Sequence, residues 1–316
     1  MPPVGTENIS TGAQALPSRS RGGGIVIAAT LLTALLAGHR FIPNVRGVGS
    51  LIDSGAPFLG LGVPVLALTA LLRRSRRALL AVLVPAVAWA ALFGAVWLPD
   101  GGGPVELRVA SQNLKVGNAD PSATVRAVVA SDPDVIALQE IAGEARPSVR
   151  ETLRDRYPHE AEQSTVGLWS RWPIRESVGV DTGLPWTRAL RAVVAAPTGD
   201  VVVYVVHLGS ARAGRTATRD HTVEALSAAL RRDGAQRIIV LGDFNTATTD
   251  RMMAPLTDQL HDAQAEAGRG FGFTWPSALP VTRPDHVLYR GLTAASAGVV
   301  RTPASDHRAV VAGFRR

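Results

Sequence analysis

Polar side chains of the kinds that bind metals and phosphates stand at the ends of six predicted β-strands. The clearest case is the apolar run 237–241, which stops at Gly242, Asp243, Phe244 and Asn245, because strand interiors disfavour glycine, aspartate and asparagine. The other five ends carry Asn113, Glu140, His207, Asp285 and the adjacent pair Asp306 and His307. In a mixed sheet, the exit of one strand lies on the same rim as the entry of its antiparallel neighbour. We therefore expect these side chains to converge on one site.

Each of these residues also has an ordinary structural explanation. Asn113 and Asn245 are common turn formers, Asp285 can mark a strand boundary, and His207 can be a hydrogen-bonded histidine at a sheet edge. Jointly, two amides, four carboxylates and two histidines at strand ends favour a catalytic or metal centre. The other histidines lack this setting and are interpreted as structural or surface residues: His39, His159, His221, His261 and His286.

Periodicity predicts the elements that would position these residues. Strands are expected at 105–113, 134–140, 166–170, 190–196, 200–207, 237–241, 285–289, 297–301 and 308–314. Helices are expected at 121–130, with Asp120 as N-cap, at 144–156 and at 216–232. The segment 246–270 is expected to be helical or irregular. The chain contains no cysteine, which excludes disulfides and thiolate chemistry, so any metal must use oxygen and nitrogen ligands.

The composition changes sharply near Pro104 and divides the chain into residues 1–103 and 104–316. The first part contains three uncharged, mostly apolar stretches, at 22–38, 54–72 and 78–99. Each is about long enough to cross a hydrocarbon core of ~30 Å as a helix. Buried helices of a soluble domain are the alternative, but these stretches have almost no polar face to show to water. We predict a three-span membrane anchor followed by a globular domain.

The charge distribution argues against reading the high pI as a nucleic-acid signal. The formal charge is +7 and the pI about 10.9. Most of the excess lies in the apolar part, however, and the globular part is nearly balanced. The densest cluster, Arg-Arg-Ser-Arg-Arg at 73–77, joins the second and third spans and should stay cytoplasmic.

That orientation places the N-terminal tail inside, in agreement with Arg19 and Arg21, and exports the globular domain. A cleaved signal peptide in place of the first span is an alternative that also exports this domain. Residues 97–99 (Trp-Leu-Pro) and 100–103 (Asp-Gly-Gly-Gly) are expected to form an interfacial anchor and a short flexible joint. The globular domain should therefore lie close to the outer membrane surface.

The globular part resembles the endonuclease/exonuclease/phosphatase superfamily of metal-dependent phosphoesterases. The motifs that carry the resemblance are Gln112-Asn113, Leu138-Gln139-Glu140, Leu168-Trp169-Ser170-Arg171-Trp172-Pro173-Ile174, Val206-His207-Leu208, Gly242-Asp243-Phe244-Asn245, Asp285 and Ser305-Asp306-His307. The resemblance implies an α/β fold, a four-layer αββα sandwich of two mixed sheets with helices outside. One departure concerns Pro284 and His286, which stand where the family usually has an aliphatic and an aromatic residue and so loosen the assignment of Asp285.

The same resemblance implies Mg²⁺ or Mn²⁺ as cofactor and a role for each site residue. Glu140 would bind the metal, with Asn113 beside it and Asp306 as an adjacent ligand or a carboxylate of a second metal site. Asp243 would activate the attacking water, and Asn245 and His207 would hold phosphoryl oxygens. His307, oriented by Asp285, would be the general base or a donor in the transition state.

Three functional hypotheses follow. A lipid-linked phosphate at the outer membrane face is favoured as the substrate, because the catalytic domain is tethered and nearly neutral. An extracellular nuclease is the alternative, for which Arg212, Arg215 and Arg219 form a candidate basic edge; a solvated helix face explains these arginines better. A non-catalytic membrane binding protein is the third. The three spans also make the chain similar to bacterial membrane proteins associated with resistance to teicoplanin-type glycopeptides.

Overall fold

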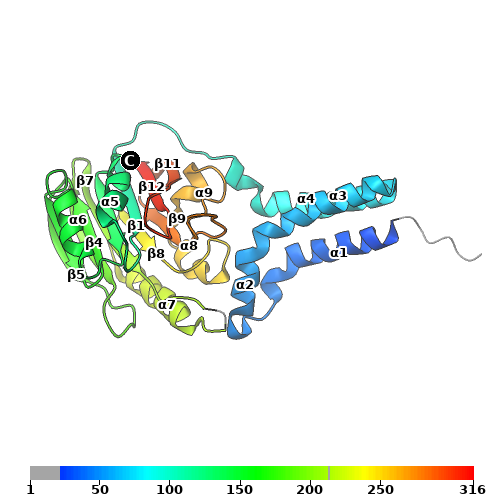
Figure 1. The fold of residues 1–316 in the computed structure, drawn as a ribbon, viewed down its shortest axis with the longest axis horizontal. Helices are drawn as coiled ribbons and strands as arrows, with labels where there is room; N and C mark the ends of the chain where they lie inside the picture. The colour runs from blue at the N-terminus through cyan, green and yellow to red at the C-terminus, as the bar shows by residue number, and fades with distance from the viewer. Residues whose placement is uncertain (1–21, 213) are drawn as a thin grey trace, which may run out of the picture.

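The computed structural model describes residues 22–212 and 214–316. Arg19 and Arg21, which entered the orientation argument, lie outside the described residues. The described chain forms a layered globular domain from which three apolar helices project (Figure 1). These helices are α1 (Gly23–Gly38), α3 (Gly62–Leu72) and α4 (Arg76–Phe93), and α2 (Val48–Gly55) lies between them and the domain.

Two six-stranded mixed sheets form the centre of the domain, as predicted. The first has the order β11-β12-β1-β2-β4-β3 and the second β5-β6-β7-β8-β10-β9. The first sheet contains β1 (Leu107–Asn113), β2 (Val135–Gln139), β3 (His159–Gln163), β4 (Val166–Ser170), β11 (Thr293–Val300) and β12 (Ala309–Arg315). The second contains β5 (Ile174–Gly179), β6 (Ala189–Ala196), β7 (Gly199–His207), β8 (Ile238–Asp243), β9 (His261–Asp262) and β10 (Asp285–Arg290).

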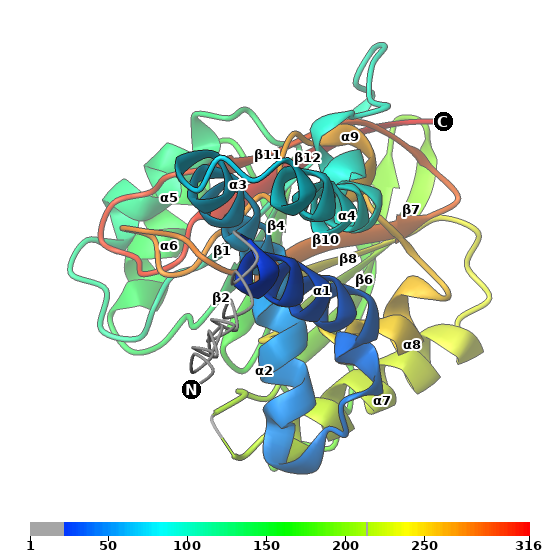
Figure 2. The same cartoon turned by 90° about the vertical axis from the view of Figure 1, so that its right-hand side faces the viewer.

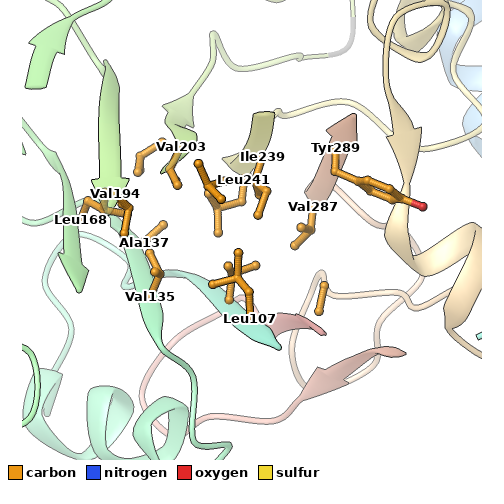
Figure 3. Close-up of a cluster of buried hydrophobic side chains, with 14 of the residues drawn as sticks. Leu107, Val135, Ala137, Leu168, Val194, Val203, Ile239, Leu241, Val287 and Tyr289 are labelled. Carbon is orange, nitrogen blue, oxygen red and sulfur yellow. The ribbon is translucent and has the colours of Figure 1, made fainter. Parts of the chain in front are cut away.

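The two sheets pack face to face through an apolar core. Side chains from the first sheet, such as Leu107 and Ala137, meet Val203 and Leu241 from the second (Figure 3). Separate apolar clusters attach α5 (Pro121–Val129) and α6 (Ala145–Leu153) to the first sheet, and α7 (Ala217–Arg232) and α8 (Ala254–Thr257) to the second. A further short helix, α9 (Ala263–Ala267), lies beside β11. The four-layer sandwich is therefore confirmed.

Most strand and helix expectations hold, but three strands were missed. β3, β5 and β9 carry charged, half-exposed or exposed side chains at the sheet edges, so they lack the apolar run that identifies a strand in sequence. The expected N-cap is present, because the Asp120 carboxylate accepts a hydrogen bond from the Ala123 N–H at 2.8 Å. The hairpin β6–β7 pairs in continuous register from Ala189 to Ala196.

Three helical segments are long and apolar enough to cross a membrane: Gly23–Phe41, Val45–Leu72 and Arg76–Trp97. The second is longer than the predicted 54–72, because a 3-10 segment (Val45–Gly47) and α2 precede the 3-10 segment Ala56–Leu61 and α3. Figure 2 shows α2 running from the other apolar helices toward α7.

The predicted joint after the anchor is held against the domain. The Asp100 N–H donates to the Glu266 carbonyl at 2.7 Å, and the Gly270 N–H donates to Val96 at 2.6 Å. The Trp97 ring makes an edge contact with Phe271, with 6.2 Å between the centroids. These contacts fix the direction of the connection, which a run of glycines alone would leave free.

We expect a Gly242→Ala substitution to destabilise the domain. Gly242 has φ +146°, and a Cβ atom there would lie 1.9 Å from the Val206 carbonyl oxygen in the paired strand β7. Overpacking of this kind costs about 1–3 kcal/mol or more, so the thermal unfolding midpoint should fall by several degrees. Circular dichroism of the detergent-solubilised protein measures this, with Gly234→Ala as control because a Cβ at Gly234 meets no atom within 4 Å. Equal midpoints for the two variants would contradict the steric argument.

Candidate active site

Strand register brings the predicted residues of the second sheet together. Asp285 pairs directly with Asp243 across antiparallel β10 and β8. His207 pairs with Asp243 across parallel β7 and β8. The exits of two strands and the entry of a third therefore share one rim, as the sequence argument required. Pro284 and His286 do not move Asp285 out of the site. The Pro284 carbonyl accepts a hydrogen bond from the Phe244 N–H at 2.9 Å, next to the pair formed by Asp285 and Asp243.

The first sheet supplies Asn113 and Glu140 to the same place. Asn113 ends β1, and Glu140 follows β2 with φ +59°, a left-handed conformation uncommon for glutamate. The Asn113 Nδ2 atom donates to Glu140 Oε1 at 3.1 Å and to Asp243 Oδ2 at 3.0 Å. One amide thus joins carboxylates that belong to the two different sheets.

Local hydrogen bonds hold Asn245 and Asp243 in fixed orientations. Asn245 has φ +51°, and its backbone N–H donates to Asp243 Oδ1 at 2.8 Å. Its side-chain Nδ2 donates to the Leu208 carbonyl at 3.1 Å, so the amide oxygen points away from that carbonyl. Asp243 is buried, and burial together with the charge of Asp285 raises the pKa of its carboxyl. A raised pKa makes this carboxylate a stronger base than an exposed aspartate.

His307 belongs to a hydrogen-bonded chain with Asp285 and Thr274. Its Nδ1 lies 2.9 Å from Asp285 Oδ2, which also accepts from the Thr274 hydroxyl at 2.5 Å. Burial disfavours the imidazolium, but the carboxylate charges of Asp285 and Asp243 outweigh burial and raise the pKa of His307 to about 9. At neutral pH His307 therefore carries a proton on each ring nitrogen. Its Nε2 lies 4.0 Å from Asp243 Oδ2, which leaves an approach for a third group.

His207 has the opposite electrostatic setting. Burial lowers the pKa of its imidazole by more than the charge of Asp243 raises it, and the positive charges of Arg188 and His307 lower it further. Its Nε2 lies 3.7 Å from Glu140 Oε1 and 3.8 Å from Asp243 Oδ2, distances too long for direct hydrogen bonds. A neutral imidazole with Nε2 turned toward the two carboxylates is suited to bind an added group between them.

Asp306 lies beside the site rather than within its hydrogen-bond network. Its carboxylate is half-exposed, and its backbone carbonyl accepts from the Ser277 N–H at 2.7 Å. Asp306 lines a surface cavity together with Lys115 and Arg301. No hydrogen bond from this carboxylate to another predicted site residue occurs in the described part of the chain. Its assignment as a metal ligand stays a prediction.

Arg188 was not identified from the sequence but faces the site. It precedes β6, whose first residue pairs with Val206 next to His207. Burial lowers the pKa of its guanidinium, while the charges of Asp243 and Glu140 oppose that shift. Its Nε is buried with no partner among the described residues. The search for polar residues at the ends of predicted strands would have found Arg188 if it had included cationic residues just before a strand.

The donor atoms suit a hard divalent cation near Glu140. Glu140 and Asp243 place two carboxylates around one amide nitrogen, and oxygen donors of this kind are the preferred ligands of Mg²⁺. Donor atoms of Asp243, Asp285 and His307 also lie within 4.8 Å of one another. The Nδ1 of His307 and one oxygen of Asp285 are already paired with each other, so this trio forms a hydrogen-bonded chain more readily than a metal cage.

Comparison with known proteins identifies the fold. A family profile described as the Endonuclease/Exonuclease/phosphatase family matches residues 110–307, more than half of the chain. No curated protein matches the chain significantly.

Solved structures match with low identity. A humanized D. rerio TDP2 is 19% identical with TM-score 0.56, covering 66% of this chain and 99% of its own. A Bacteroides thetaiotaomicron mannosyl-6-phosphatase is 16% identical with TM-score 0.56, covering 66% and 100%. Sphingomyelinase C of Streptomyces griseocarneus is 20% identical with TM-score 0.52, covering 67% and 99%. At these identities the structures share the fold, and their different names indicate different substrates.

We expect His307 to titrate near pH 9 in the metal-free protein. Because the folded pKa exceeds the ordinary value of about 6.5, the folded state binds the extra proton, and its contribution to stability is lost as pH rises through about 9. In an Asp285→Asn variant the pKa should fall, since the amide removes the negative charge next to Nδ1. NMR titration of the histidine ring protons measures both values. A His307 midpoint unchanged by Asp285→Asn would refute the assigned cause.

Proposed function

Because the chain belongs to the endonuclease/exonuclease/phosphatase family, we propose that it is a membrane-anchored phosphoesterase acting on a lipid-linked phosphate ester or pyrophosphate at the outer membrane face. Members of this family are hydrolases that act on phosphate esters. The observation that carries the proposal is the meeting of Asn113 and Glu140 from one sheet with His207, Asp243 and Asp285 from the other.

Enzymes of this family generally depend on a divalent metal, and we propose Mg²⁺ or Mn²⁺ here. Glu140 would hold the ion, with Asp306 as an adjacent carboxylate. Asn113 would contribute through its Oδ1, which here accepts from the Lys115 N–H at 2.9 Å, because its Nδ2 is a donor. The ion would neutralise phosphate charge and stabilise the leaving oxygen. The remaining catalytic roles belong to side chains of the chain itself.

Asp243 is the proposed base for the attacking water. Its Oδ1 is held by the Asn245 N–H and its Oδ2 by Asn113, so the carboxylate is fixed in direction while its basicity is increased by burial. It takes a proton from water as the water oxygen bonds to phosphorus. The bond between phosphorus and the leaving oxygen then breaks, and that oxygen leaves with the bonding electrons and takes a proton from solvent, while Asp243 returns its proton to solvent. The products are a phosphate and an alcohol, or two phosphates for a pyrophosphate.

The other side chains stabilise charge on the phosphoryl oxygens. The raised pKa of His307, about 9, supports a role as donor through Nε2 over a role as general base. His207 and Asn245 supply neutral donors, and Arg188, the residue before β6, supplies a cation. Such preorganised donors typically contribute about 10²–10³ each to the rate.

The lipid-linked substrate is favoured over nucleic acid for two reasons. The catalytic domain follows directly on the apolar helices and is held against them (Figure 1). The candidate basic edge loses one of its three members, because Arg219 is buried, 1% exposed, and bonded to Asp250 at 2.8 Å. This arginine was predicted to face solvent and does not. Nucleic-acid binding depends chiefly on accessible cations.

The resemblance to membrane proteins associated with teicoplanin-type resistance adds a narrower hypothesis. A cell-wall precursor carried on a lipid phosphate lies on the outer membrane face, where we propose that the catalytic domain works. Its chemistry, a phosphate between a hydrocarbon and a polar group, fits the proposed reaction. The hypothesis concerns the substrate and leaves the catalytic roles above unchanged.

Purified full-length protein with Mg²⁺ is expected to release phosphate or a head group from at least one member of a panel of lipid pyrophosphates, phospholipids and DNA. Asp243→Ala should lower the rate by about 10²–10⁴, the usual contribution of a general base. The matched control is Asp258→Ala, which removes an exposed aspartate on the domain surface. Cleavage of DNA but of no lipid would favour the nuclease, and no hydrolysis at all would favour the non-catalytic alternative.

The catalytic domain is expected to be accessible from outside the cell. Protease added to intact cells should remove an epitope at the C-terminus, since the Arg-rich segment 73–77 is predicted to stay cytoplasmic. Replacing its arginines by glutamine should reduce this orientation preference. Protection of the domain until the membrane is broken would overturn the proposed sidedness.

A further inference from the structure

A cavity of about 710 Å³ lies between the catalytic rim and the segment that links the first two apolar helices. Asn245 and His307 line one side, and Val48, Leu51 and Phe58 line another. Pockets that hold small molecules measure ~300–1,000 Å³. The cavity therefore has room for a larger part of a substrate than its phosphate group.

The anchor contributes one wall of this cavity, formed by Val48, Leu51 and Phe58, and this wall is apolar and exposed. Leu51 is 70% exposed, Val48 48% and Phe58 39%. Contiguous exposed apolar surface of this kind marks a ligand, protein or membrane contact. It continues along the chain to Leu61, 65% exposed, within the apolar stretch Val45–Leu72. One apolar surface thus extends from the catalytic rim onto a helix predicted to enter the bilayer.

Buried polar contacts fix this wall to the catalytic domain. Asp53 of α2 is fully buried, and its carboxylate accepts from Arg251 Nε at 2.6 Å and lies 2.8 Å from His39 Nδ1. Ser50, one turn earlier, donates to Asp250 at 3.0 Å and accepts from Arg219 at 3.1 Å. Burial of charge is tolerated only when partners of this kind are in place. The docked position of α2 is therefore specified.

The far end of the wall touches the loop that orients His307. The Phe58 ring stacks on Phe273, with 5.6 Å between centroids. The next residue, Thr274, donates to the Asp285 oxygen that is paired with His307. The anchor consequently contacts both the cavity and the support of a catalytic side chain.

We propose that residues 46–58 form the binding surface for the hydrocarbon chain attached to the substrate phosphate, so that the anchor is part of the substrate site and more than a tether. This proposal rests on the proposed function, because it requires that the site residues at the strand ends act on a phosphate. A hydrocarbon chain is the occupant that matches exposed apolar side chains continuous with a bilayer helix. Arg46 and Arg212, which also line the cavity and are exposed, suit the anionic group next to that chain.

The first test maps the chain by photo-crosslinking, a measurement independent of catalysis. Full-length protein in lipid nanodiscs is irradiated with hexadecyl phosphate that carries a diazirine in the chain, and labelled peptides are found by mass spectrometry. Label is expected on residues 46–58, and excess hexadecyl phosphate should displace it whereas ethyl phosphate should not. Label confined to the outer faces of α1, α3 and α4 would overturn the proposal.

The second test compares Leu51→Gln with Val45→Gln. Both residues are exposed apolar positions in the same segment, but only Leu51 lines the cavity. Leu51→Gln should lower the labelling by about tenfold, the usual scale for a lost hydrophobic contact. It should lower by the same factor the preference for C16 over C2 chains, measured as hydrolysis of alkyl diphosphates and of p-nitrophenyl alkyl phosphates. Val45→Gln should leave both as in the unsubstituted protein. Because partition into the bilayer is the same for both variants, it cannot produce this difference.

The outcomes separate the two proposals. If the wall is labelled and no phosphate compound is hydrolysed, the proposed function fails and the hydrocarbon site stands. If hydrolysis occurs but Leu51→Gln changes neither labelling nor chain-length preference, the hydrocarbon site fails and the proposed function stands.

Discussion

The structure depends on a buried carboxylate, Asp243, placed where the two sheets meet. It accepts hydrogen bonds from Asn113 of the first sheet and from the Asn245 backbone of the second. A buried charge without such donors would cost several kcal/mol, so the strand ends must bring both donors to the same point. Gly242 permits this, because only a residue without a Cβ fits against Val206 at the end of the β7–β8 pair. The fold and the site therefore impose the same requirement on this stretch of chain.

The strand ends could be predicted because each polar residue interrupts an apolar run. That signal, combined with the rule for antiparallel neighbours, was sufficient to expect that Asp243, Asp285 and His207 share one rim, and their register bears this out. The edge strands β3 and β5 were not predicted because most of their side chains are charged, half-exposed or exposed. Burial of Arg219 could not be predicted either, since its partners Ser50 and Asp250 are far from it in sequence. The sequence shows that three arginines lie close together along the chain, but whether each side chain is buried depends on tertiary contacts such as those of Arg219 with Ser50 and Asp250.

The same limit explains why the role of α2 was not foreseen. In sequence, Asp53 interrupts the apolar pattern, so the predicted second span begins at residue 54. In the structure Asp53 pairs with Arg251 and His39. The charged residue excluded the segment from the predicted span, and the same charge docks it to the domain. Polar residues next to an apolar span are thus candidates for contacts with a neighbouring domain.

Two carboxylates that face each other in the β8–β10 ladder are assigned different roles by their partners. Asp285 is engaged by the Thr274 hydroxyl and the His307 ring, so its charge is committed to keeping that imidazole protonated. The Asp243 carboxylate is bonded to amide N–H groups and lies 3.8 to 4.0 Å from two imidazole nitrogens. Burial raises its pKa while no cation is in direct contact. The register pair Asp243 and Asp285 thus has a protonated imidazole, His307, bonded to one carboxylate and 4.0 Å from the more basic other one. Because hydrolysis of a phosphate ester needs an acidic donor and a base at once, this pairing favours a hydrolytic site over a purely structural cluster.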